Sequence, residues 1–268
     1  MKKIGRYLVI LYAIIHFYQM NVFGQQTDLT HRDIFPKGIS FDYGIGNYSV
    51  QDDFFSGEKY SGSLPYIKLG WSRFHDKRAF QLYLEYRSSD EIKSGTFSAS
   101  VTQFSLESNY LYPIGSFQLF SKKVYAYLGP YSEFYFYYNK QNFANDGLFF
   151  DFTFASLISI GVQPMLIMPI DKRLQVESSL QINILSVSMR MIEVEDLNDG
   201  SEEESPLKLV TPFGGLNTQW NLGIRYYPFK FLSLKLRYEA EITRTTHQRY
   251  MISASDNLVF GISFHLNK

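Results

Sequence analysis

Apolar and polar residues alternate with a period of two along much of this chain. Side chains on a β-strand point to opposite faces in turn, so this pattern predicts strands with one apolar and one polar face. After residue 24, no stretch keeps the three-to-four residue spacing of an amphipathic helix. The clearest alternating stretches are residues 39–46, 80–87, 174–184, 232–242 and 257–266.

Five further segments alternate less cleanly, and they bring the expected number of strands to about ten. These segments are residues 64–73, 102–112, 124–138, 150–168 and 220–227. Strands of soluble proteins are commonly about 5–6 residues long, whereas a tilted strand needs about 9–11 residues to cross a bilayer. Several of the expected strands reach the longer length. The pattern therefore predicts an all-β fold, a transmembrane antiparallel up-and-down β-barrel of about ten strands.

The links between these strands fall into two groups. Links on one side are long and polar, at residues 51–60, 88–100, 139–148, 190–212 and 245–255. Links on the other side are short, at residues 74–77, 113–123, 169–173 and 228–230. Bacterial barrels have short periplasmic turns and longer extracellular loops. We therefore expect the chain ends on the periplasmic side and the acidic segment 193–204 outside.

Three of the four short links begin with an apolar or aromatic run that is broken by proline, in the pentapeptides YLYPI, LIMPI and RYYPF. Proline has no N–H for the strand ladder. The sequence therefore predicts that Pro113, Pro169 and Pro228 end their strands, with aromatic neighbours at the membrane interface.

Composition agrees with many strands, because the 268 residues include 21 Tyr and 24 Phe. The absence of Cys excludes a disulfide framework, a thiolate metal site and a lipid-anchored lipoprotein. Residues 1–24 hold three of the 26 basic residues and none of the 26 acidic ones, so their removal leaves a slight acidic excess. That balance argues against a nucleic-acid partner.

The N-terminus has the organisation of a secretory signal peptide. Lys2, Lys3 and Arg6 precede an apolar core at residues 7–18, and small residues precede a cleavage point after Gly24. An uncleaved N-terminal anchor is the alternative. We expect a signal peptide at 1–24, a short periplasmic segment at 25–37 and the barrel at 38–268.

The polar faces of the expected strands carry many charges, which would be costly against lipid and are expected to face the lumen. A charge network is predicted from Glu85, Arg87, Glu107, Glu133, Glu177, Arg225, Lys235, Arg237 and Glu239. Further inward charges are expected at Asp42, Lys68, Asp151 and Glu241. They could form a salt-bridged filling that holds the barrel shape. The alternative is a narrow pore or a binding cavity lined by carboxylates and tyrosines.

The final strand resembles the C-terminal signal that the outer-membrane barrel-assembly machinery recognises. Gly261, Phe264 and Leu266 match its Gly, aromatic and apolar positions, whereas Val259 replaces the usual polar residue. The resemblance implies the assembly machinery as a partner through these three residues.

The mature chain resembles the small outer-membrane β-barrel proteins of the Bacteroidota. The resemblance rests on Gln25-Gln26 at the expected mature start, YLGPY at 127–131, the aromatic-Pro turns and the terminal strand. It implies location in the outer membrane, with lipid and lipopolysaccharide as neighbours, but no particular activity.

Candidate chemistry outside the lumen is sparse. Asp52, Asp53 and His247 could mimic part of an omptin-type protease rim, and His247 or His265 could serve a lipase-like Ser–His pair. The acidic segment 193–204 could bind Ca²⁺ weakly, although its spacing departs from a calcium loop. We expect no catalytic site, metal or cofactor.

The most consistent function is therefore a structural, binding or narrow-channel role. A rim-active hydrolase is one alternative. An accessory membrane subunit of a secretion or gliding system, which would bind a partner through its loops, is another.

Overall fold

The computed structural model describes residues 34–53, 56–75, 78–95, 97–142, 152–191, 207–247 and 250–266. The predicted signal peptide, Asp151 and the acidic segment 193–204 lie outside these residues. The strands are β1 (Gly38–Asp52), β2 (Ser56–Ser63), β3 (Tyr66–His75), β4 (Arg78–Ser94), β5 (Phe97–Leu119), β6 (Lys122–Asn142), β7 (Phe152–Pro169), β8 (Leu174–Met191), β9 (Leu207–Val210), β10 (Gly215–Phe229), β11 (Leu232–Thr245) and β12 (Met251–His265).

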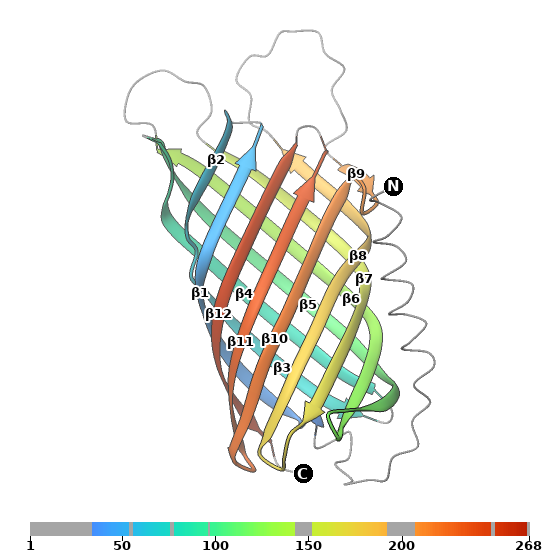
Figure 1. The fold of residues 1–268 in the computed structure, drawn as a ribbon. Coiled ribbons are helices and arrows are strands. Elements are labelled where there is room, and N and C mark those ends of the chain that lie inside the picture. Colours follow the sequence, from blue (N-terminus) through green and yellow to red (C-terminus); the bar gives the residue numbers. More distant parts are fainter. Residues whose placement is uncertain are drawn as a thin grey trace, which may run out of the picture.

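The strands close into one antiparallel barrel (Figure 1). The first strand pairs with the last along its whole length, from Gly38 opposite His265 to Asp52 opposite Met251. Strands β2 and β3 both lie between β1 and β4, and β9 and β10 both pair with β8. The pair β2 and β3 and the pair β9 and β10 therefore each fill one position in the wall. The predicted ten-stranded antiparallel barrel is confirmed.

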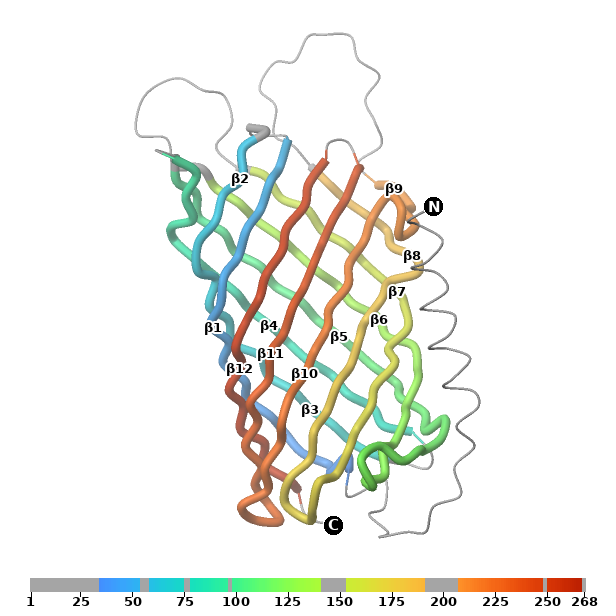
Figure 2. The backbone as a smooth tube through the Cα atoms, in the orientation of Figure 1, coloured from blue at the N-terminus to red at the C-terminus, as the bar shows by residue number. Residues whose placement is uncertain are grey.

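The strands are tilted relative to the barrel axis, as the tube in Figure 2 shows. Residues that lie opposite one another on neighbouring strands form a row around the wall. Starting from Val187 on β8, the row passes through Ile158 on β7 and then crosses β6, β5, β4 and β3 to reach β1. The row continues through β12, β11 and β10 and returns to β8 at Leu174 instead of Val187. This offset is the stagger that a closed barrel of tilted strands requires.

The two faces of the wall are opposite in character. On β12, for example, Leu258, Phe260, Ile262 and Phe264 are 42–55% exposed on the outside, while the residues between them are buried. Similar apolar side chains cover the outside of the other long strands, and polar side chains fill the inside. An apolar exterior around a polar interior suits a barrel surrounded by lipid. Within the described residues, no helix is long and apolar enough to cross a membrane.

The prolines occupy different places from those predicted. Pro169 is the last residue of β7, as expected. Pro113 lies inside β5 beside a register shift between Pro113 and Gly115, and Pro228 lies inside β10 at a shift between Tyr226 and Phe229. A bulge tolerates a residue that has no N–H, so the ladder continues past these two prolines. The prediction that the prolines end their strands was confirmed for Pro169, missed by one residue for Pro228, which is next to last in β10, and was wrong for Pro113.

Several predicted loops are also shorter than expected, because strands extend into them. The predicted link 113–123 is mostly strand, and its turn is at Phe120 and Ser121, which have positive φ. The predicted link 88–100 is a hairpin that turns near Gly95, at φ 57°. Apolar and polar residues do not alternate regularly along these stretches, so they lack the pattern that marks the lipid-facing strands.

Candidate functional site

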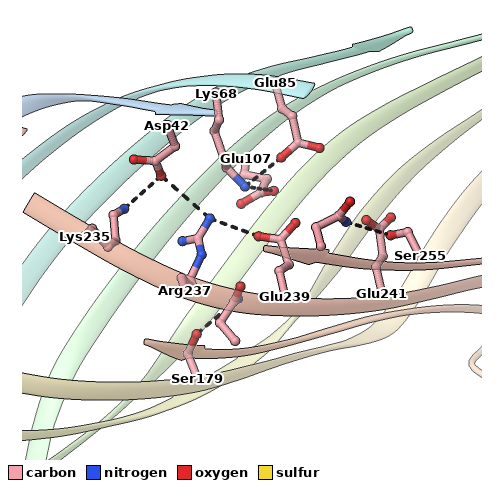
Figure 3. A network of polar contacts seen from close by, with 12 residues as sticks. Asp42, Lys68, Glu85, Glu107, Ser179, Lys235, Arg237, Glu239, Glu241 and Ser255 are labelled. Carbon is pink, nitrogen blue, oxygen red and sulfur yellow. Dashed lines mark hydrogen bonds and ion pairs between the residues drawn. The ribbon is translucent and has the colours of Figure 1, made fainter. Parts of the chain in front are cut away.

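All nine residues of the predicted charge network lie on the inner face of the wall. Eight of them are less than 10% exposed, and Arg225 is half-buried, with a side-chain exposure of 14%. In Figure 3, side chains from β1, β3 and β4, among them Asp42, Lys68 and Glu85, point toward Lys235, Arg237 and Glu239 on β11. Most buried charged side chains of the described residues lie on this inner face, which is therefore the candidate site.

One continuous series of ion pairs crosses the lumen. Asp42 on β1 accepts a hydrogen bond from Lys235 at 2.8 Å and lies 3.6 Å from Arg237. Arg237 in turn contacts Glu239 at 2.9 Å. Glu239 lies 3.3 Å from Arg87, which reaches it from β4. Acids and bases therefore alternate along the series, which lowers the cost of burying each of them.

The series divides at Arg87 and continues to β5. The Arg87 guanidinium contacts Glu241 at 2.7 Å and also donates to Glu85. Lys68 links Glu85 to Glu107, with N–O distances of 3.0 and 2.9 Å. The Arg87 guanidinium also lies over the ring of Tyr66, with its Cζ atom 4.8 Å from the ring centre. Such a cation–π contact further stabilises a buried guanidinium.

Three of the predicted network residues lie outside this series. Glu177 and Arg225 form a separate pair at 2.9 Å. Glu133 accepts a hydrogen bond from the Asn217 amide at 2.6 Å. Conversely, Asp42, Lys68 and Glu241 were expected only to point inward; Asp42 and Lys68 each bridge two partners of the series, and Glu241 ends one of its branches. The prediction identified the inner face but not the partners.

Next to the ion-pair series lies a cavity of about 40 Å³, which is lined by amide side chains and by members of the series such as Lys68 and Arg237. Both amide atoms of Asn109, the carbonyl oxygen of Gln163 and that of Asn221 are buried there without a hydrogen-bond partner. A water molecule needs about 10–15 Å³ and two to four polar partners, so this cavity suits a few ordered waters. Sequence reasoning did not single out these amides, because an uncharged inner residue carries no distinctive signal.

Apolar side chains fill the lumen at the end of the barrel that holds the first residue of β1 and the last of β12. Ile34 and Phe35, just before β1, are 1% and 3% exposed and pack with Leu111 and Tyr127. The rings of Phe35 and Tyr127 meet edge to face with centres 4.9 Å apart. The Ser72 hydroxyl donates to the Pro36 carbonyl at 3.1 Å and fixes this segment. We call this end the terminal end, and Ile34 with Phe35 the N-terminal plug.

The opposite end, here called the loop end, is filled by a second apolar cluster. It contains Tyr48, Val50, Tyr60, Leu64, Ile92, Ala99, Val101, Tyr135, Tyr137, Ala155, Leu157 and Met251. The rings of Tyr48, Tyr60, Tyr135 and Tyr137 therefore occupy much of the lumen on this side of the charges. The large side chains of this cluster leave the ion-pair series between two apolar layers.

The residues of the protease-like and lipase-like hypotheses are divided between the two ends. Asp52 is buried and paired with Arg190, whereas Asp53 is exposed. The His247 ring nitrogen Nδ1 lies 3.2 Å from the Ser188 hydroxyl at the loop end. His265 makes a similar contact at the terminal end, 3.0 Å from the Ser233 hydroxyl. Among the described residues, no group of three or more acidic or histidine side chains is arranged to hold a metal ion.

Comparison with known proteins finds similarity in structure but not in sequence. No protein-family model matches the chain, and no curated protein sequence matches it significantly. The outer-membrane protease OmpT from Escherichia coli superposes with a TM-score of 0.50 at 7% identity, over 90% of this chain and 99% of OmpT. The translocator domain of the autotransporter NalP from Neisseria meningitidis gives 0.44 at 11% identity, over 99% of this chain and 95% of that domain. Neisserial surface protein A gives 0.37 at 10% identity, over 85% and 97%.

The fold is that of an outer-membrane β-barrel. The superposition on OmpT shows this fold, and the apolar exterior suits a barrel that is surrounded by lipid. The likeness carries no information about activity at this level of identity. Of the C-terminal signal residues, Phe264 and Leu266 face outward with exposures of 55% and 47%, and Gly261 lies on the inner face.

Proposed function

We propose that this protein is a closed outer-membrane barrel with a structural or binding role, and that it is not an open channel. The observation that carries the proposal is the filling of the lumen at three levels. The N-terminal plug occupies the terminal end, the ion-pair series crosses the middle, and the tyrosine-rich cluster occupies the loop end. An aqueous channel needs a continuous polar opening, which these three layers interrupt.

Planar-bilayer conductance tests this proposal directly. The full mature chain, folded into lipid vesicles and checked by heat-modifiable migration on gels, should give no stepwise current above the lipid baseline. The gel check ensures that a silent bilayer does not reflect unfolded protein. Reproducible single-channel steps from the wild-type chain would contradict the closed-barrel role and favour the narrow-channel alternative.

We also propose that any binding role uses the loop end and involves a protein partner, as in an accessory subunit of a secretion or gliding system. Support comes from the strands at that end, because β2 and the ends of β4 and β5 continue beyond the lipid-facing region with polar outer surfaces. Gentle solubilisation followed by affinity purification should recover a partner in fixed stoichiometry. A clean monomer under cross-linking conditions would count against this role.

A hydrolase remains the second candidate, because one contact has the geometry of a nucleophile and its base. The 3.2 Å separation of His247 and Ser188 lies within the usual range for such pairs. Ser188 and Arg190 are neighbours on the inner face of β8, so the Asp52–Arg190 ion pair lies next to this contact. However, Ser188 and His247 are each only 1% exposed, so a substrate could not reach them without a rearrangement of the loop end.

A fluorophosphonate probe, which labels activated serines, separates the two candidates. The closed-barrel role predicts no labelling of the folded wild-type chain. It also predicts that any hydrolysis measured in the preparation is the same in Asp52→Ala, Asp53→Ala and His247→Ala as in the wild type. Stoichiometric labelling that disappears in Ser188→Ala and His247→Ala, but survives in Ser233→Ala, would support a hydrolase. The last variant is a matched control, because Ser233 has the same kind of histidine contact at the other end.

The assignment to the Bacteroidota type and the use of the C-terminal strand by the barrel-assembly machinery are part of this proposal. Their support is the sequence pattern together with the outward position of Phe264 and Leu266. Substitution of Phe264 by Ser should reduce insertion in cells more than refolding into detergent micelles.

A further inference from the structure

The outer surface at the loop end is not uniform around the barrel. Over β7, β8, β9 and the turn that follows, it carries five exposed apolar side chains, which we call the apolar lobe. They are Ile158 (56% exposed), Val187 (37%), Leu207 (55%), Leu209 (65%) and Phe213 (89%). Soluble surfaces rarely expose so much contiguous apolar area without a binding role.

The lobe is contiguous across the strands. Ile158 on β7 is paired with Val187 on β8, and Val187 is paired with Leu209 on β9. The side chains therefore form a row across three neighbouring strands. In Figure 1, β9 lies at the loop end of the wall, far from the C-terminus.

The wall that carries β2 is polar at the same end. The exposed side chains on β2 include Lys59 and Ser61, and the nearby end of β4 exposes Asp90. Glu91 and Lys93, also on β4, form an ion pair at 2.9 Å while both remain more than half exposed. One side of the loop end is therefore suited to water and the other to an apolar environment.

Below the lobe, the apolar surface continues without a break into the lipid-facing region. Ile160 follows Ile158 on the outer face of β7, and Ile184 lies below Val187 on β8; each is 54% exposed. Continuity with the lipid-facing surface decides the occupant, because lipid chains can cover it without any matched protein surface. We propose that the apolar lobe is covered by the acyl chains of the outer leaflet, so that lipid reaches the loop end over β7–β9 but not over β2.

This placement has a consequence for orientation. The lipid boundary would lie higher on the β7–β9 wall than on the β1–β4 wall. A barrel can meet that demand by tilting, or the bilayer can thicken locally, at a modest cost per ångström of mismatch. The protein would then present its polar wall obliquely to the outside.

Depth-dependent quenching by lipids with brominated acyl chains tests the proposal. The chain has two tryptophans, and Trp220, which is 42% exposed on the outer face of β10, is the lipid-facing reference in a Trp71→Phe background. In a background without both tryptophans, Leu209→Trp places one reporter in the lobe and Ser61→Trp places the matched control on β2. Val187→Trp is a second lobe reporter should Leu209→Trp fold poorly, and heat-modifiable migration checks each variant.

The lobe reporter should be quenched to a similar extent as Trp220 and at least several-fold more than the Ser61→Trp control. Equal, weak quenching of the Leu209→Trp and Ser61→Trp variants would overturn the proposal, since it places the lobe in water. A blue-shifted but unquenched lobe reporter would also overturn it, because a second copy of the chain would then cover the surface.

Discussion

Lys68 provides a sharp test of the lumen network, because it is the bridge between two carboxylates. Its amino group lies 3.0 Å from Glu85 and 2.9 Å from Glu107, and all three side chains are 3–5% exposed. Substitution by Met keeps most of the alkyl volume and removes the charge. Glu85 retains its contact with Arg87, whereas the contact left to the Glu107 carboxylate among the described residues is a long hydrogen bond of 3.5 Å from Gln181.

The magnitude follows from the distance and the burial. At 2.9 Å and an effective dielectric constant near 20, the attraction between Lys68 and Glu107 is about 6 kcal/mol, against about 1 kcal/mol in water. Removing one partner of a buried pair typically costs about 3–5 kcal/mol, because the other charge stays buried. We therefore expect Lys68→Met to lower the free energy of unfolding by about 3–5 kcal/mol. The double variant Lys68→Met/Glu107→Gln should recover most of this loss.

Urea unfolding of the vesicle-inserted protein, followed by tryptophan fluorescence and by gel migration, measures these changes. The exposed pair Glu91–Lys93 has the same 2.9 Å distance with exposures of 58% and 61%, so Lys93→Met is a matched control. It should change the free energy of unfolding by less than about 1 kcal/mol. The reasoning fails if Lys68→Met is as mild as the control, or if the double variant is no more stable than the single one.

Three further predictions concern close packing in the wall and the plug. At Gly129, an added Cβ would lie 1.6 Å from the Tyr110 carbonyl oxygen, whereas at Gly115 it would meet nothing within 4 Å. Gly129→Ala should therefore fold poorly, and Gly115→Ala should fold like the wild type. Equal yields of heat-modifiable barrel from the two variants would contradict this prediction. Phe35→Ala should lower the free energy of unfolding by about 3–5 kcal/mol, and Phe120→Ala, at an 86% exposed turn residue, by less than about 1 kcal/mol. Phe35→Ala should still give no conductance, because the ion-pair series above the plug remains; new current steps would show that the plug alone closes the lumen.

Sequence alone was sufficient for the fold and for the direction of most side chains. A period of two is a local property, and each lipid-facing strand repeats it over many residues. The signal disappears where strands extend beyond the lipid, as in residues 88–94, because the outer face is then polar and the alternation is irregular, with Ile92 as the one large apolar side chain. Backbone pairing continues there, since hydrogen bonds between strands do not depend on the pattern of side chains. The predicted loops were too long for this reason.

The partners within the lumen could not be predicted in the same way. Lys235 and Asp42 are 193 positions apart, and they meet only because the last strands close the barrel against the first. The stagger of the wall decides which inner residues share a level, and a shift of two residues would exchange every partner while preserving every facing. The N-terminal plug was missed for a different reason: Ile34 and Phe35 precede the alternating pattern and carry no strand signal.

Gly261 joins these local and long-range requirements. It belongs to the C-terminal pattern that resembles an assembly signal, and in the barrel it lies opposite Asp42 on one side and Lys235 on the other. A Cβ at this position would lie 2.2 Å from a carboxylate oxygen of Asp42 and 3.0 Å from the Lys235 side chain. The absence of a side chain on β12 is therefore what lets β1 and β11 form an ion pair across the strand between them. The packing of the lumen therefore requires a glycine here, whether or not the assembly machinery also recognises it. For this reason Gly261 is weaker support for an assembly signal than Phe264 and Leu266, which face outward.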